Sequence, residues 1–260
     1  MTQTTRMPAV FLGHGSPMNT LEQNQFTVAW RQFGASIPKP RAVLSVSAHW
    51  FTQGTHVTAM PTPETIHDFG GFPQALFDFQ YPAPGDPKLA QRVADLLKPL
   101  SVGLDQHWGL DHGTWSVLAH VFPKADIPVV QLSIDRTKPA QFHYDLGKQL
   151  APLRDEGVLI LGSGNVVHNL GIMNWREQNV AFDWANRFND LVKASLRSGD
   201  HAPLIGYDRL GQDAELSINS AEHYLPLLYI TALQNADDKP ALFTDGIFGG
   251  SISMLSVAYG

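Results

Sequence analysis

Eleven histidines and no cysteine stand out in this chain of 260 residues. The absence of cysteine excludes disulfides, thiolate metal sites and a cysteine nucleophile. Neutral imidazole is the commonest borderline ligand for zinc, iron, copper and nickel. A metal site in this chain would therefore be built from histidine, with or without carboxylates.

Three of the histidines follow short apolar runs that are typical of buried strands. If these strands are parallel neighbours, their imidazoles meet at the carboxyl edge of the sheet, where open α/β sheets place their sites. Glycines flank the first histidine and precede the third, so the backbone can turn tightly there. The runs and their histidines are residues 8–13 with His14, 41–49 with His49, and 157–164 with His168.

A fourth histidine, His223, lies near the start of an apolar helix expected over residues 219–235, and the N-terminus of that helix can approach the same edge. His107 lies close to His112 in an uninformative setting. The remaining histidines considered have no comparable placement and are expected at the surface or in loops. These are His56, His67, His120, His143 and His201.

Alternating strand and helix patterns must position these side chains. Short apolar strands separated by helices predict an α/β/α sandwich with a largely parallel or mixed central sheet, formed by residues 1–260 as a single domain. Further strands are expected at 55–60, 101–104, 127–134, 241–244 and 251–257. Helices are expected at 20–34, from Asp86-Pro87 to about 98, within 111–122, and at 138–153, 180–197 and 219–235.

Charge and composition exclude several classes of partner. The net charge of −6 leaves nothing basic to neutralise a phosphate backbone, which argues against nucleic acid. No apolar stretch approaches 18 residues, so no membrane span is expected, and the N-terminus has no signal-like run. A cytoplasmic location is expected. The P-loop and the G-x-S-x-G and H-E-x-x-H motifs are absent, and Gly162-x-Gly164 lacks the third glycine of a dinucleotide fingerprint.

Taken together in order, five motifs and one loop resemble the class III extradiol ring-cleavage dioxygenases, and most closely their DOPA-dioxygenase branch. The resemblance covers essentially the whole chain. The motifs are Gly13-His14-Gly15-Ser16-Pro17, Ser45-Val46-Ser47-Ala48-His49-Trp50, Asp111-His112-Gly113-Thr114-Trp115, Gly162-Ser163-Gly164 with His168-Asn169, and Ala221-Glu222-His223, and the loop is His67-Asp68-Phe69-Gly70-Gly71-Phe72-Pro73.

The resemblance implies one divalent metal per chain, Fe(II) for turnover, with Zn(II) as an occupant of the isolated protein. His14, His49 and His223 match the metal ligands, His223 standing where the wider group has a glutamate. His168 matches the active-site base and can also complete a four-histidine shell. His112 matches a second catalytic histidine. The implied reaction is 4,5-cleavage of a catechol such as L-DOPA with O2, giving a seco-DOPA semialdehyde.

Two other functions are compatible with four clustered imidazoles. A zinc hydrolase would use zinc to lower the pKa of a bound water to about 7. A non-catalytic protein would keep the metal site for binding only. An assembly of identical chains is also left open. The aromatic loop at residues 62–82 is expected either to form a wall over the substrate ring or simply to pack on the sheet.

Overall fold

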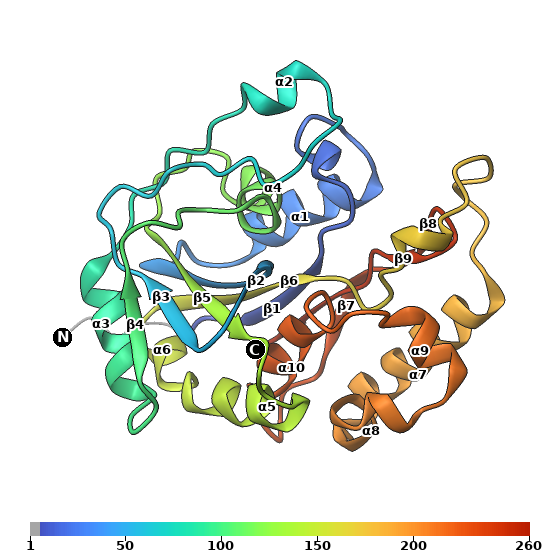
Figure 1. Cartoon of the computed structure of the whole chain (residues 1–260). Coiled ribbons are helices and arrows are strands. Elements are labelled where there is room, and N and C mark those ends of the chain that lie inside the picture. The colour runs from blue at the N-terminus through green and yellow to red at the C-terminus, as the bar shows by residue number, and fades with distance from the viewer. Residues whose placement is uncertain (1–5) are drawn as a thin grey trace.

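Eight strands form one mixed sheet in the order β4-β3-β5-β2-β6-β1-β10-β7 in this computed structural model, which describes residues 6–260 (Figure 1). The central strands β5, β2, β6 and β1 are parallel, whereas β10 and β7 add antiparallel pairs at one side. The strands are β1 Ala9–Gly13, β2 Ala42–Thr52, β3 Thr55–Thr58, β4 Val102–Asp105, β5 Val129–Asp135, β6 Val158–Gly164, β7 Ala241–Thr244 and β10 Ser256–Tyr259. A separate short pair is formed by β8 Ile247–Phe248 and β9 Ile252–Ser253.

Helices cover both faces of this sheet (Figure 1). Helices α1 and α4 lie on one face, and α3, α5, α6 and α10 lie on the other, with α7 to α9 beside them. The helices are α1 Gln25–Ser36, α2 Gln74–Phe77, α3 Pro87–Leu96, α4 His112–Val121, α5 Ala140–Gln149, α6 Pro152–Asp155, α7 Asp183–Ser198, α8 Ala202–Ile205, α9 Gln212–Ser217 and α10 Leu225–Thr231. This arrangement confirms the predicted α/β/α sandwich.

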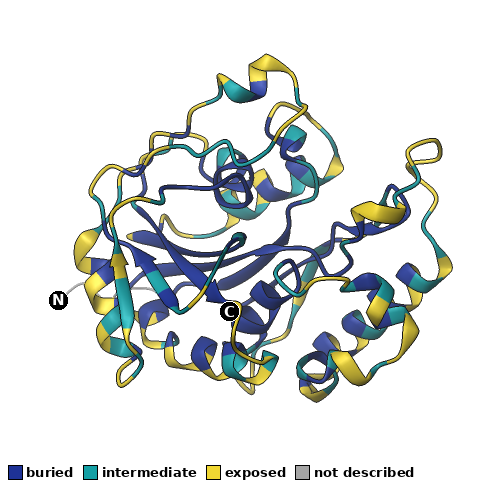
Figure 2. Cartoon of the chain, viewed as in Figure 1, coloured by how far each residue is buried: buried dark blue, intermediate teal, exposed yellow. Residues whose placement is uncertain are grey.

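The central strands are apolar because both of their faces are covered. Successive side chains of a strand point to opposite faces. Val10 and Leu12 of β1 accordingly belong to the apolar cluster of Trp115 in α4, whereas Phe11 belongs to that of Tyr229 in α10. Figure 2 shows the strands buried between helices whose outer sides are exposed. A sheet enclosed in this way is a rigid support for side chains at its edge.

The three strands predicted to carry histidines are neighbours. β6 pairs in parallel with β2 on one side and with β1 on the other. The carboxyl ends of all three therefore meet at one edge, as the sequence predicts. β1 also pairs antiparallel with β10, with Ala9 opposite Tyr259 and Phe11 opposite Val257.

The predicted start of α3 is confirmed in detail. The Asp86 side chain accepts hydrogen bonds from the backbone N–H groups of Lys88 and Leu89 at 3.1 and 3.0 Å, and Pro87 occupies the first turn. Proline fits there because the N–H that it lacks has no helical partner at that position.

Two predicted helices have different bounds. The helix expected over 219–235 is α10, Leu225–Thr231. Bends and turns occupy residues 219–224, so that His223 lies before the helix. Pro226 stands in the first turn, where proline is tolerated, and so marks the start of the helix. The helix expected over 20–34 begins at Gln25, because Asn24 caps it through its side chain.

Three histidines expected at the surface or in loops are buried instead: His120, His143 and His201. A buried imidazole needs a hydrogen-bond partner, and each ring finds one. The partners are the Asn19 carbonyl at 2.7 Å, the Tyr229 hydroxyl at 2.9 Å and the Tyr144 hydroxyl at 3.0 Å, respectively.

Short helices α8 and α9 were not predicted, since four- and six-residue helices carry too few turns for a periodic pattern. Within residues 6–260, no helix combines the length and the hydropathy that crossing a bilayer would need.

Candidate metal centre

His14 directly follows the carboxyl end of β1, and its ring is held in one orientation. Gly15 has a φ of 62°, a left-handed backbone that glycine adopts without strain, so the chain turns away from the sheet here. The Ser163 hydroxyl donates to the Gly113 carbonyl oxygen at 2.5 Å, so its oxygen accepts from His14 Nδ1 at 3.0 Å. The proton of this ring is therefore on Nδ1, and the Nε2 lone pair is free.

His49 lies inside β2 and not at the end of the predicted strand, because β2 continues to Thr52. The pairing of β2 with β5 changes register between Val46 and Phe51, around His49. Such irregularities re-aim side chains next to functional sites. The Nδ1 atom of His49 lies 3.3 Å from the Asp68 carboxylate, which places the proton on Nδ1 and leaves Nε2 free.

His112 is the first residue of α4. Asp111 caps this helix by accepting from the Thr114 backbone N–H at 3.1 Å, and Ser47 of β2 donates to the same carboxylate at 2.7 Å. The cap thus ties the start of α4 to the strand that carries His49. Both the backbone N–H and the Nδ1 of His112 donate to Asp68 Oδ1 at 2.9 Å.

One carboxylate therefore orients two rings. Asp68 accepts from His112 through Oδ1 and contacts His49 through Oδ2. Burial alone would raise the pKa of Asp68, but hydrogen bonds from His112 and the charge interactions with both rings lower it below its usual value. Carboxylates that hold the distal nitrogen of a histidine are a common second layer of metal sites, because they fix the ring and raise its basicity.

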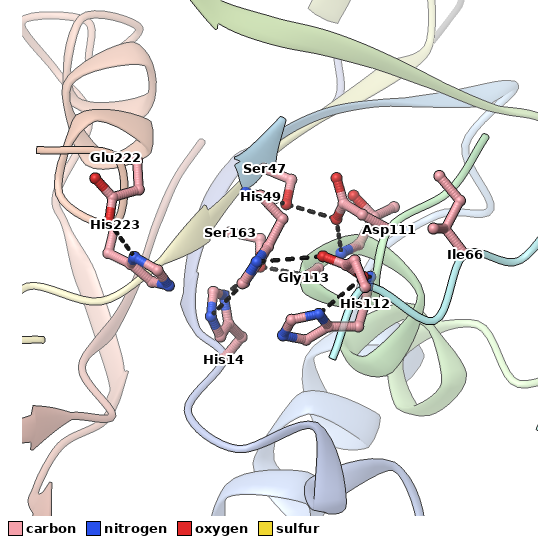
Figure 3. A network of polar contacts seen from close by, with 12 residues as sticks. His14, Ser47, His49, Ile66, Asp111, His112, Gly113, Ser163, Glu222 and His223 are labelled. Atoms are coloured by element: carbon pink, nitrogen blue, oxygen red, sulfur yellow. Dashed lines mark hydrogen bonds and ion pairs between the residues drawn. The ribbon is translucent and has the colours of Figure 1, made fainter. Parts of the chain in front are cut away.

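The free nitrogens of His14 and His49 face each other at 3.4 Å (Figure 3). Both rings carry their proton on Nδ1, so neither Nε2 can donate to the other, and two lone pairs meet. Two nitrogens bound at about 2.1 Å to one tetrahedral ion lie about 3.4 Å apart. The geometry therefore fits a bound divalent metal, and a cation removes the repulsion between the two lone pairs.

The pair of His14 and His49 can be joined by either of two histidines as a third ligand. Ring nitrogens of His14, His49 and His112 all lie within 4.8 Å of one another. The ring centroids of His14, His49 and His223 form a nearly equilateral triangle with sides of 5.2, 5.3 and 5.1 Å. Rings on one tetrahedral ion with bonds of about 2.1 Å have centroids about 5 Å apart. The centroid of His112 is only 3.8 Å from that of His49, which is too close for two ligands in this arrangement.

His223 and His168 reach the same place from loops. A Cβ at Gly164, the last residue of β6, would collide with the His223 carbonyl oxygen, so only glycine allows this close approach. The Glu222 carboxylate lies 3.2 Å from His223 Nδ1. The ring of His168 stacks on that of His223, with centroids 3.5 Å apart and planes 4° from parallel.

Burial lowers the pKa of four of these rings. The loss of hydration, followed by repulsion from neighbouring imidazoles, places the pKa of His14 and His223 well below the usual value. Burial lowers the pKa of His49 to about 3 and that of His168 to about 4. The rings are therefore neutral near pH 7 and offer lone pairs to a metal or to a proton.

The rings line one end of a cavity of about 590 Å³, a size typical of small-molecule sites. Five histidines contribute: His14, His49, His112, His168 and His223. The remaining wall is largely apolar and includes Phe69, Phe72, Phe248, Ile252 and Met254. The site residues named from the sequence therefore lie together beside one cavity.

The aromatic loop at residues 62–82 contributes to both the cavity and the core. Phe69 and Phe72 line the cavity, and the Phe69 ring meets that of His112 with centroids 5.4 Å apart. Phe79 instead stacks on Trp115 of α4, with centroids 5.3 Å apart. The two interpretations left open for this loop thus apply to different residues of it.

The sequence reasoning did not identify Asp68 and Glu222 as parts of the site. Both stand inside the motifs that carry the family resemblance, and Glu222 is the immediate neighbour of His223. Metal-binding histidines usually pair with carboxylates. An Asp or Glu close in sequence to a candidate ligand, or in a loop expected to cover the site, is therefore a signal for such residues.

Replacing Asp68 by asparagine is expected to weaken metal binding about 10- to 100-fold, as loss of an outer-shell partner typically does. The amide cannot accept from His49 and His112 at once through two oxygens, so one ring loses its orientation. Competition with a chromophoric chelator measures the affinity. Asp78→Asn in the same loop is the matched control, since Asp78 is exposed and bonds to Gln74. Equal affinities of the two variants would contradict the role of Asp68.

Comparisons with known proteins agree with this site. Residues 4–241 match the family described as the catalytic LigB subunit of aromatic ring-opening dioxygenase. The chain is 53% identical to a protein of Escherichia coli K12 named 4,5-DOPA dioxygenase extradiol, over 99% of this chain and 96% of that protein.

A plant relative and a solved structure extend the comparison. The protein of the same name from Beta vulgaris is 38% identical over 94% of this chain and 92% of its own length. A crystal structure of an uncharacterized protein from Escherichia coli K12 superposes with a TM-score of 0.86 at 48% identity, covering 98% of this chain and all of that one. These findings confirm the resemblance found in the sequence, and the chain belongs to the LigB family of extradiol aromatic ring-opening dioxygenases.

Proposed function

We propose that this dioxygenase opens the ring of a catechol such as L-DOPA by 4,5-cleavage with O2, giving a seco-DOPA semialdehyde. The observation that carries the proposal is the pair of opposed Nε2 atoms of His14 and His49 at the end of an apolar cavity. Relatives from Escherichia coli and Beta vulgaris bear the name of this activity. Family membership favours it over a zinc hydrolase or a non-catalytic binding protein.

The metal is held, in this proposal, by His14, His49 and His223. His168, which the family resemblance also allowed as a fourth ligand, stacks on His223 with centroids 3.5 Å apart, which is too close for both rings to bind one ion in this arrangement. The nearly equal separations of the three ring centroids support this set over the one with His112. These rings would hold a divalent metal whose charge would make a nearby catechol hydroxyl easier to deprotonate, and Fe(II), unlike Zn(II), would also supply the redox states that reaction with O2 requires. We therefore assign Fe(II) to turnover and Zn(II) to the isolated protein.

His168 is the proposed base. Burial lowers its pKa to about 4, so the ring is neutral and can accept a proton from a catechol hydroxyl and return it later. Its stacking on His223 fixes the plane of the ring. His112 is the proposed second catalytic histidine. Because its Nδ1 donates to Asp68, its Nε2 is the atom available to substrate or oxygen.

The rest of the chain excludes water and supports the site. Phe69, Phe72 and Met254 line the cavity that receives the substrate ring, so bulk water is displaced when a catechol enters. We also propose that residues 1–260 act as a single domain, because the strands that carry the site come from both halves of the sequence and share one sheet. Residues 1–5 lie outside the described part.

Anaerobic loading with Fe(II), followed by O2 and a panel of catechols, tests this function. The expected result is oxygen consumption and a yellow ring-opened product with L-DOPA, and neither with the zinc-loaded protein. Hydrolysis of amides or esters by the zinc form without oxygen, and no uptake of oxygen with any catechol, would instead support the hydrolase.

A further inference from the structure

The ionisable side chains around the cavity, apart from histidines, are of one sign. Of the described residues that line it, none is lysine or arginine, and Glu22 is acidic. Two further carboxylates, Asp68 and Glu222, lie directly behind the rings. A charged group on the side chain of a bound catechol therefore meets only negatively charged side chains here, apart from the histidines.

Glu22 is placed to meet such a group. It follows the short helix of residues 17–20, which continues from His14 along the cavity, and its side chain is exposed at the rim. Among residues 6–260, no side chain forms a salt bridge or hydrogen bond with its carboxylate. A substrate cation does not have to displace an existing partner there.

The amide side chains beside Glu22 are already engaged. Asn24 Oδ1 caps α1 by accepting from two backbone N–H groups, and its Nδ2 donates to Asn19 Oδ1 at 2.8 Å. Asn19 Nδ2 donates to the His14 carbonyl oxygen at 3.0 Å. The donors left for a substrate carboxylate are neutral and include the Ser16 hydroxyl, the Gln178 amide and the Trp175 indole N–H.

We propose that the cavity selects catechols whose side chain carries a cation, L-DOPA among them, with Glu22 as the residue that binds the ammonium group, and that a side-chain carboxylate gains no cationic side chain as a partner from the lining. The inference rests on the proposed catechol cleavage and specifies the substrate class within it. A carboxylate in this cavity would lose hydration without gaining a cationic partner, which is unfavourable. An ammonium group gains Glu22 at the rim.

Arg176 is the positively charged side chain to examine as a partner for a substrate carboxylate. It adjoins Trp175, which lines the cavity, but Arg176 itself is exposed and does not line it. Arg176 is the lysine or arginine nearest in sequence to a residue that lines the cavity, so it is the cation to remove when testing for recognition of a carboxylate. The proposal therefore expects Arg176→Gln to leave the substrate preference unchanged.

The experiment compares kcat/KM of the Fe(II)-loaded protein for three catechols: 3,4-dihydroxyphenethylamine, 3-(3,4-dihydroxyphenyl)propionate and neutral 4-methylcatechol. We expect kcat/KM for the amine to exceed kcat/KM for the carboxylate about tenfold. Glu22→Gln should reduce that ratio about three- to fivefold, as removal of one rim ion pair does, with the loss falling on the amine when both values are normalised to that for 4-methylcatechol. Glu22→Lys should favour the carboxylate. The matched control is Glu215→Gln, an exposed change on α9 away from the cavity.

Three results would overturn the proposal. The unmodified protein would prefer the carboxylate, Glu22→Gln would leave the amine-to-carboxylate ratio of kcat/KM unchanged, or Arg176→Gln alone would lose turnover of the carboxylate. Binding of two monophenols that cannot be cleaved, tyramine and 3-(4-hydroxyphenyl)propionate, supplies a second readout by calorimetry. Tighter binding of tyramine that depends on Glu22, in a protein that opens none of the catechols, would sustain this inference and contradict the proposed function. Equal binding of both compounds would contradict the inference alone.

Discussion

Alanine at His14 or His49 is expected to yield folded protein without bound metal and with turnover reduced at least about 1000-fold, because the metal contributes several kcal/mol to the transition state. Each change removes one of the two facing nitrogens that lie 3.4 Å apart. Mass spectrometry of the metal content and an oxygen electrode measure the two effects. His107→Ala, an exposed histidine outside the cavity, is the matched control.

The same assay separates the two possible third ligands. His223→Ala is expected to lose metal, whereas His112→Ala is expected to keep it and to lose turnover. The reverse result would show that His14, His49 and His112, the group with the closest nitrogens, hold the ion. Full metal content in His14→Ala would contradict the site itself.

Replacing His168 by alanine is expected to preserve the metal content and to lower turnover about 100- to 10,000-fold, the usual contribution of a general acid–base group. Removing the ring takes away the proton acceptor but leaves the triangle of His14, His49 and His223. Oxygen uptake with a saturating catechol measures the loss.

Two outcomes would contradict this role of His168. Unchanged oxygen uptake would show that the ring is not the base, and loss of metal would show that it is a required ligand. Circular dichroism must accompany the assay, because the backbone N–H of His168 also donates to the Ser217 carbonyl oxygen at 2.9 Å. A retained spectrum shows that this backbone contact survives.

The sequence predicts the sheet well because its central strands are buried on both faces. Such strands are apolar throughout, and their boundaries are easy to locate. The meeting of His14, His49 and His168 follows from strand order, which the alternation of strands and helices restricts but does not determine. The helix expected over residues 219–235 brought His223 toward the same edge, and the family resemblance supplied its role as the third ligand, since no periodic pattern gives a function to a residue in a turn before a helix.

Other parts of the site depend on contacts between segments distant in sequence. Asp68 and His112 are 44 residues apart, and nothing in the local pattern of either indicates that one carboxylate serves two rings. The register shift around His49 is likewise a property of the pairing with β5 and not of β2 alone. Buried histidines such as His143 were missed for the same reason, since its partner Tyr229 lies 86 residues away.

The pairing of β1 with β10 has a consequence for how the protein is made. His14 directly follows β1, and the backbone N–H of Gly13 donates to the Ser256 hydroxyl of β10 at 3.2 Å. Gly13 and Ser256 are 243 residues apart, so the ribosome must deliver that length of chain before this edge of β1 is covered. Nascent chains would carry an unpaired apolar strand beside the future ligand, and open edges of this kind invite association with other chains. Formation of this edge of the sheet is thus coupled to synthesis of β10, and long-range pairing of this kind makes folding slow.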